Sequence, residues 1–244
     1  MTHQICNRSW AGVGVLALAA LAALAGLSSA GARAQSFCSS DGRRQPAGLL
    51  ERFISADCEA CWSQDGPRPA PGELALDWIV PGSKGDDAAL SAAASRDALT
   101  RLTALARAAP AASDAVQHRV QAARRGLRVS HGPPINGYLG TSIEFKSPGP
   151  GPWSSWLLLV ETIPAGVEGT PIERNLVRNA LESSWGGSGP LSRDELARLY
   201  ESRPMRIADG AQPSRLRVVG WMLDGRGRMR AIAQSQCSPA GPDG

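Results

Sequence analysis

An apolar segment near the start of the chain constrains the fold most, because it determines the compartment in which folding takes place. Residues 11–27 are almost wholly Ala, Leu, Val and Gly, and only Arg8 is charged before them. The Ala-Arg-Ala tripeptide at residues 32–34 fits the small-x-small pattern that signal peptidase cleaves. We therefore predict a signal peptide over residues 1–34 and a mature chain that begins at Gln35 in the periplasm or outside the cell.

The alternative interpretation of this segment is a membrane anchor. The apolar run has 17 residues, which is the short end of the roughly 17–25 residues that span a bilayer. It is also rich in Ala rather than in Leu, Ile or Phe. We therefore expect cleavage, and no contact with the membrane afterwards.

Export makes disulfide bonds the expected state of the remaining cysteines. Cleavage removes Cys6 and leaves Cys38, Cys58, Cys61 and Cys237. Four cysteines in an oxidising compartment suggest two disulfides, for which three pairings exist. We favour Cys38–Cys237 as a structural bond between the two ends of the mature chain. We favour Cys58–Cys61 as the second bond, because only this pairing is a candidate for redox activity.

The charge balance argues against nucleic acid as a partner. Without Arg8 and Arg33 the mature chain has 24 basic and 22 acidic residues, a net charge of +2. Binding to phosphates requires a concentrated basic surface instead. The mature chain of 210 residues is long enough for one large or two small domains.

Hydrophobic patterning divides the mature chain into two parts near Gly126. Residues 35–126 are expected to form an α/β domain, and residues 127–244 a β-rich, sandwich-like domain. In the first part we predict strands over residues 49–55 and 74–80 and helices over residues 86–109 and 113–125. In the second part we predict strands over residues 127–130, 138–146 and 153–163, a helix over residues 192–203, and a final hairpin of residues 215–223 and 228–236. Residues 175–181 fit either a strand or a helix.

The Cys-x-x-Cys motif of Cys58 and Cys61 is the one motif that carries chemistry. A strand that runs into Cys-x-x-Cys is typical of a thiol–disulfide exchange site, in which the first cysteine attacks and the second resolves the mixed disulfide. Cys58 would then be the attacking thiol and Cys61 the resolving one. Asp57 and Glu59 oppose this role, because their negative charges raise the pKa of a neighbouring thiol.

The alternatives to redox exchange are a small structural disulfide and a metal site. No second Cys pair or His pair stands at the spacing of zinc ligands, so we predict neither a metal nor a cofactor. His118 is expected to be a solvated residue on a helix. His131 is expected in a turn before Pro133.

Three stretches of the chain resemble a family of secreted bacterial proteins of undetermined function. These are residues 50–61 around Cys-x-x-Cys, residues 156–160 (Trp-Leu-Leu-Leu-Val) and residues 174–179 (Arg-Asn-Leu-Val-Arg-Asn). The resemblance implies a shortened thioredoxin-like domain over residues 35–126, a β-rich second domain, and a strand at residues 175–181.

In thioredoxin-like sites a cis-proline faces the cysteines, and the only candidates here are Pro133 and Pro134. The segment of residues 129–137 is either that cis-proline segment or the first strand of the second domain. The prolines that follow Cys61, from Pro67 to Pro71, also depart from the family, in which a full helix continues.

Two hypotheses of function follow. The first is an exported thiol–disulfide oxidoreductase that exchanges disulfides with another envelope protein or a small thiol through Cys58 and Cys61. The second is a non-catalytic envelope binding protein with two structural disulfides. Its candidate surface aromatics are Trp153, Trp156, Trp185 and Trp221.

Overall fold

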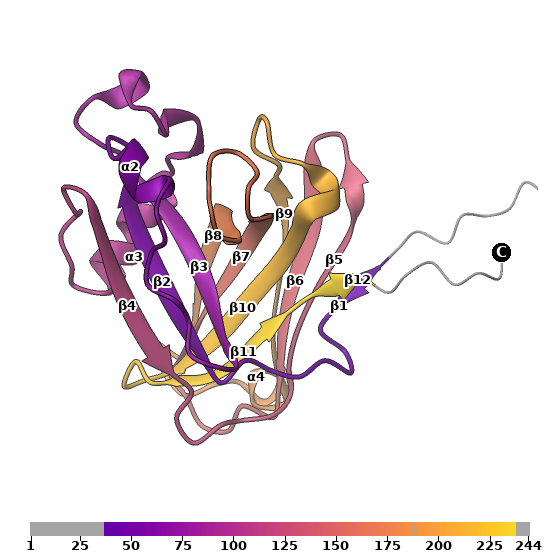
Figure 1. Ribbon diagram of the computed structural model, residues 1–244. Helices are drawn as coiled ribbons and strands as arrows, with labels where there is room; N and C mark the ends of the chain where they lie inside the picture. Colours follow the sequence, from indigo (N-terminus) through magenta and orange to yellow (C-terminus); the bar gives the residue numbers. More distant parts are fainter. Residues whose placement is uncertain (1–36, 188, 238–244) are drawn as a thin grey trace, which may run out of the picture. The chain divides into compact units, whose positions relative to one another are not determined.

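The computed structural model describes residues 37–187 and 189–237 (Figure 1). The predicted signal peptide lies outside the described residues. The described residues belong to one compact unit, in which 46% of residues are in strands and 14% in helices. The predicted fold class, a shortened thioredoxin-like α/β domain before a β-rich domain, is therefore wrong. Among the described residues, no helix is long and apolar enough to cross a membrane.

The larger of the two sheets has seven strands in the order β11-β10-β7-β8-β3-β2-β4. They are β2 (Gly48–Ser55), β3 (Glu73–Val80), β4 (Ser113–Arg119), β7 (Trp153–Ile163), β8 (Arg174–Trp185), β10 (Leu216–Asp224) and β11 (Met229–Gln234). The pairs β2–β3 and β3–β8 are parallel, and the other pairs are antiparallel. Strands from both sides of Gly126 therefore share one sheet.

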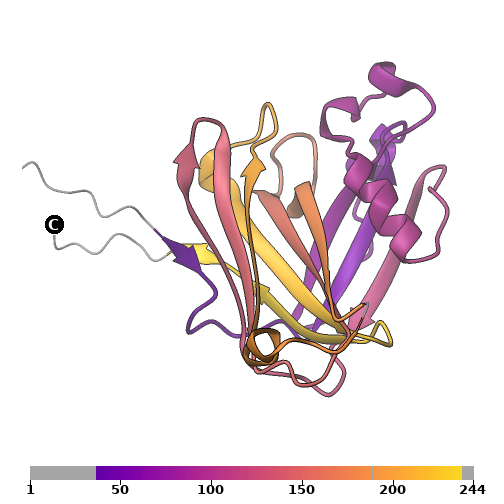
Figure 2. The same ribbon diagram turned by 180° about the vertical axis from the view of Figure 1, so that it is seen from behind.

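The smaller sheet has five strands in the order β12-β1-β5-β6-β9. They are β1 (Cys38–Ser39), β5 (Leu127–Ile135), β6 (Tyr138–Lys146), β9 (Arg198–Arg206) and β12 (Gln236–Cys237). This sheet packs against one face of β7, β10 and β11 (Figures 1 and 2). The packing is close at Gly220, where a Cβ atom would lie 2.8 Å from Val129 Cγ1 and 2.9 Å from Ile143 Cδ1.

The opposite face of the large sheet encloses a second core. The chain that follows β4 bonds to β11, since Gln121 N donates to Met229 O at 2.8 Å and Arg124 N donates to Arg230 O at 2.8 Å. The two edges of the large sheet therefore approach each other. Helix α3 (Arg96–Ala104) packs its buried side chains into this core, and it is visible beside β2, β3 and β4 in Figure 2.

A buried ion pair lies among three tryptophans in this second core, one of which, Trp78, donates from its Nε1 to Glu51 Oε1 at 3.0 Å. Arg101 donates to both carboxylate oxygens of Glu51, with its Nη2 at 2.6 Å from Oε2. The Arg101 guanidinium lies 4.9 Å from the ring centre of Trp156 and 5.0 Å from that of Trp221. Burial alone would raise the pKa of Glu51, but the charges and hydrogen bonds of Arg101 and His118 hold it below its ordinary value.

Most predicted strands are present, and the final hairpin of β10 and β11 is confirmed. The predicted helices agree less well with the structure. Residues 86–109 contain two short 3₁₀ turns (Gly85–Asp87 and Ser91–Ala93) and α3. Residues 113–119 form β4 instead of a helix, because alternate side chains such as Val116 and His118 face inwards while β4 pairs with β2.

The helix predicted over residues 192–203 begins as expected and ends early. Ser192 and Glu195 form the capping box of α4 (Arg193–Ala197). The chain then continues as β9, whose backbone pairs with β6 over the whole strand. Pairing within a sheet overrides local helix propensity here, as tertiary context often does.

We predict that Gly220→Ala lowers the free energy of unfolding by about 1–3 kcal/mol, the usual cost of overpacking a core. The added methyl group must displace side chains of β5 and β6 or separate the two sheets. Gly140→Ala in β6 is the matched control, because no atom lies within 4 Å of its added Cβ. Urea unfolding of both variants measures the difference, and equal effects would contradict close packing at Gly220.

Candidate functional site

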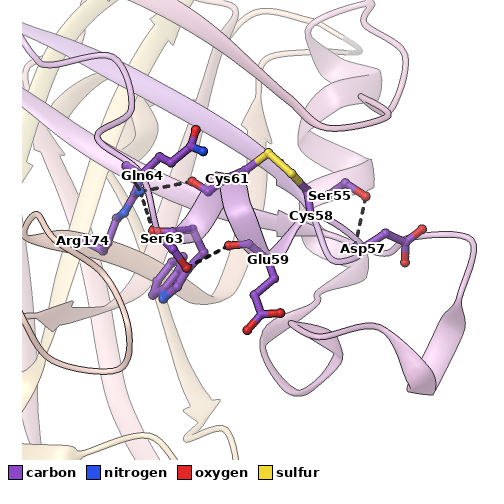
Figure 3. The surroundings of a disulfide bond; sticks show 9 residues. Ser55, Asp57, Cys58, Glu59, Cys61, Ser63, Gln64 and Arg174 are labelled. Atoms are coloured by element: carbon purple, nitrogen blue, oxygen red, sulfur yellow. Dashed lines mark hydrogen bonds between the residues drawn. A yellow bond between two sulfur atoms is a disulfide. The ribbon is translucent and has the colours of Figure 1, made fainter.

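The Cys58–Cys61 turn begins where β2 leaves the sheet. Cys58 N donates to Ser55 O at 3.0 Å, and Cys61 N donates to Cys58 O at 3.1 Å. The short helix α2 (Glu59–Trp62) follows, with Cys58 as its N-cap. The two cysteines are half-buried and joined by a disulfide. Figure 3 shows this bond at the surface of the turn.

Negative charge flanks Cys58 on both sides. The Asp57 carboxylate accepts hydrogen bonds from Ser83 N at 2.7 Å, Ser83 Oγ at 2.8 Å and Lys84 N at 3.2 Å. These hydrogen bonds hold the pKa of Asp57 below its ordinary value, and the bond from the Ser83 hydroxyl contributes most. Its side chain points away from the disulfide in Figure 3, and Glu59 is exposed. The loop of residues 82–84 therefore stabilises the ionised form of Asp57 beside Cys58.

Arg174, at the start of β8, holds the turn from the side opposite to Asp57 (Figure 3). Its Nη2 donates to the carbonyl oxygens of Cys61 at 3.3 Å, Trp62 at 3.0 Å and Gln64 at 2.7 Å. Its guanidinium also lies 5.3 Å from the ring centre of Trp62, whose Nε1 donates to Glu168 O at 2.7 Å. The backbone of the turn is thus anchored to β8 and to the preceding loop without the disulfide.

Asp77 in β3 fixes Arg174 in turn. Its fully buried carboxylate accepts from Arg174 Nη1 at 3.1 Å, from Arg52 Nη2 at 2.7 Å and from Asn175 N at 2.9 Å. Thr170 Oγ1 accepts from Arg174 Nε at 3.1 Å. Three strands of the large sheet therefore converge on one carboxylate behind the Cys58–Cys61 turn.

A cavity of about 250 Å³ lies beside Cys61. Its walls include Arg52 and Ile54 from β2, Ala115 from β4 and Pro67 from the loop after α2. Arg174, which bonds to the carbonyl oxygen of Cys61, lines the same cavity.

The second disulfide joins Cys38 and Cys237, which pair across β1 and β12. Cys38 also faces His131 in β5, and the three ligand atoms lie within 4.8 Å of one another. Both sulfur atoms are committed to the disulfide, so the oxidised group offers no thiolate to a metal. Two disulfides in one chain indicate a non-reducing environment.

His131 is buried rather than in the predicted turn. Its Nδ1 lies 3.0 Å from Gly132 O, and its Nε2 has no hydrogen-bond partner among the described residues. Burial lowers the pKa of His131 below its ordinary value, and the contact with Gly132 only partly opposes this. Burial therefore favours the neutral form of the imidazole.

Other residues singled out in the sequence lie elsewhere. Pro133 and Pro134 are in β5 of the smaller sheet, so this segment is a strand and not a loop beside Cys58. His118 is on a strand, with Nε2 at 3.0 Å from Glu51 Oε2. The tryptophans proposed as a binding surface are largely core: Trp153, Trp156 and Trp221 are buried, and Trp185 is half-buried.

Sequence reasoning missed the residues that support the turn. Asp77 stands in an otherwise apolar strand, and a charge at such a position marks a buried partner. Arg174 belongs to the most distinctive segment of the family resemblance. The contact between them joins residues 97 positions apart, which no local pattern reveals.

The chain was compared with protein-family models, curated proteins and solved structures, and none of the three comparisons found a match.

We predict that the two disulfides differ in their contribution to stability. They join residues separated by 199 and by 3 positions. The chain-entropy relation for such loops gives about 5 kcal/mol for Cys38–Cys237 and about 2 kcal/mol for Cys58–Cys61. Urea unfolding of Cys38→Ala/Cys237→Ala and of Cys58→Ala/Cys61→Ala tests this order, and a larger loss in the second variant would contradict it.

We also predict that His131 makes the fold sensitive to mild acid. Because its pKa is lowered in the folded state, the unfolded chain binds more protons below the ordinary histidine pKa of about 6.5. Stability should therefore fall as the pH drops from about 7.5 to about 5.5. His131→Asn should reduce that fall, as measured by urea unfolding at both pH values. An unchanged dependence would show that His131 is not responsible.

Proposed function

We propose that this protein exchanges disulfides through Cys58 and Cys61 with another envelope protein or with a small thiol. The observation that carries the proposal is that Arg174 and Trp62 hold the backbone of the turn independently of the sulfur–sulfur bond. The bond can then open and close while the turn keeps its shape. A bond that was needed to hold the turn would not permit this.

The size of the ring supports the same conclusion. A disulfide across four residues restricts the unfolded chain by only about 2 kcal/mol. Stabilisation is therefore a weak reason for the Cys58–Cys61 bond to exist in a protein that already has the long-range Cys38–Cys237 bond. The half-buried position of Cys58 and Cys61 leaves them open to attack.

The exchange is a two-electron reaction between one disulfide and two thiols. A partner thiolate attacks a sulfur of the Cys58–Cys61 bond, a mixed disulfide forms, and the displaced sulfur leaves as a thiolate and takes up a proton. A second partner thiolate then releases the protein as a dithiol and the partner as a disulfide. In the opposite direction Cys58 attacks a partner disulfide and Cys61 resolves the mixed disulfide.

Cys61 suits the resolving role because its carbonyl oxygen is bonded to Arg174. It therefore stays in place when Cys58 is bound to a partner. We propose the cavity beside Cys61 as the place where a small thiol binds. We propose the periplasm or the extracellular space as the site of action, on the basis of the apolar segment at residues 11–27 together with the two disulfides.

The charges around Cys58 favour the second candidate function, a non-catalytic binding protein. Asp57 and Glu59 are acidic, and negative charge disfavours a thiolate. In this alternative both disulfides are structural, and the protein contacts a partner in the envelope. The two candidates differ in the reduction potential of the Cys58–Cys61 pair.

We predict that this pair equilibrates with a glutathione buffer at a potential above about −300 mV, the upper bound that is typical of structural disulfides. The Cys38→Ala/Cys237→Ala variant isolates the pair for this measurement, and Cys58→Ala/Cys61→Ala provides the matched control with the other bond alone. Cys61→Ser should accumulate a mixed disulfide at Cys58 with glutathione, detected by mass spectrometry. A potential below about −300 mV with no mixed disulfide would assign the pair a structural role.

A further inference from the structure

A second pocket lies away from the cysteines, where β3 and β8 begin. The two strands share one pair of residues in register, Asp77 and Leu176. Just before this pair, a side chain joins the two strands where a backbone hydrogen bond would otherwise do so. The Nδ2 of Asn175 in β8 donates to Ala75 O in β3 at 2.9 Å. The strands then separate and leave a pocket of about 520 Å³, within the range of small-molecule sites.

Arg217 of β10 lines this pocket and lacks a counter-ion. Its Nη2 donates to Asn175 Oδ1 at 2.7 Å, but its Nε is buried and without a hydrogen-bond partner among the described residues. No carboxylate in the described part of the chain lies within 4.0 Å of its guanidinium. Arg217 is half-buried, whereas the fully buried arginines, Arg52, Arg101 and Arg174, are paired with Asp77 or Glu51.

An unpaired cation with an orphaned donor is costly inside a protein. Burial lowers the pKa of Arg217 below its ordinary value, and the charge of Glu173 opposes this only in part. Arg217 is also held in place, because Asn175 Oδ1 accepts from both Arg217 and Thr162 Oγ1. Its Nη1 makes no hydrogen bond within the described residues and is not buried. A fixed guanidinium with such an available donor can bind a carboxylate.

Two glutamates on the same pocket restrict the charge of a ligand. Glu73 is occupied, since its carboxylate accepts from Gln117 Nε2 at 2.7 Å and from Ala70 N at 3.0 Å. Glu173 is exposed and forms no ion pair within the described residues. Both carboxylates repel a phosphate or a dicarboxylate. The free pair of opposite charges, Arg217 and Glu173, instead suits a molecule that carries one charge of each sign.

We propose that this pocket binds a small zwitterion of the amino-acid type, with its carboxylate on Arg217 and its ammonium group towards Glu173. Gln234, which lines the same pocket, offers a further hydrogen-bonding group. This site is independent of the exchange proposed for Cys58 and Cys61. The protein thus has a ligand pocket whether or not the disulfide is exchanged.

Titration calorimetry and thermal unfolding with each of the free L-amino acids test the proposal. At least one amino acid should bind and raise the melting temperature, while its methyl ester, which lacks the carboxylate, should not. Arg217→Met should weaken binding at least about tenfold, as expected for loss of a charge-assisted hydrogen bond. Arg68→Met is the matched control, because exposed Arg68 lines the same pocket but pairs with Asp65.

Glu173→Gln provides a second test at an exposed position that does not threaten folding. It should weaken binding of the amino acid but leave binding of the N-acetylated form, which lacks the ammonium group, unchanged. The Cys58→Ala/Cys61→Ala variant should bind as the wild type does, so failure of this site is distinguishable from failure of disulfide exchange. The proposal would be overturned if no amino acid bound, or if Arg217→Met bound the amino acid as tightly as the wild type does. It would also be overturned if inorganic phosphate were the only ligand whose binding depended on Arg217.

Discussion

The buried carboxylate of Asp77 is the interaction on which the arrangement of the large sheet depends. It lies in β3 and binds Arg52 of β2, and Arg174 and the backbone of Asn175 in β8. A buried ion pair contributes little net stability when complete, but loss of one partner leaves a charge without compensation. Asp77 therefore acts mainly by specificity: only the register that brings both arginines to it leaves Asp77, Arg52 and Arg174 all paired.

This network connects the two candidate sites without merging them. On one side Arg174, which Asp77 holds in place, donates hydrogen bonds to carbonyl oxygens at the Cys58–Cys61 turn. On the other side Asn175 positions Arg217 at the pocket between β3 and β8. The same network thus supports the Cys58–Cys61 turn, for which we propose disulfide exchange, and the Arg217 guanidinium, for which we propose a ligand. A rigid second layer behind a reactive group is the usual requirement for a preorganised site.

The local elements of the chain were largely predictable, but their assembly was not. Alternation and turn residues located most strands, the capping box at Ser192 and the hairpin of β10 and β11. The thioredoxin-like interpretation failed because Cys-x-x-Cys after a strand is a local signal that many folds can carry. Residues 113–119 illustrate the limit: their composition suits a helix, and pairing with β2 makes them a strand.

The sequence by itself determined the number of cysteines and most of the segments that form strands, because these depend on residue types and on neighbours along the chain. It left three disulfide pairings open, and the structure shows Cys38–Cys237 and Cys58–Cys61. Only the tertiary structure decided that strands on both sides of Gly126 form one sheet, that Arg174 anchors the Cys58–Cys61 turn, and that Arg217 faces a pocket. Those outcomes depend on contacts between residues far apart in the sequence. The desolvation of charged groups selects among such contacts, and a linear pattern does not show which charges will be buried together.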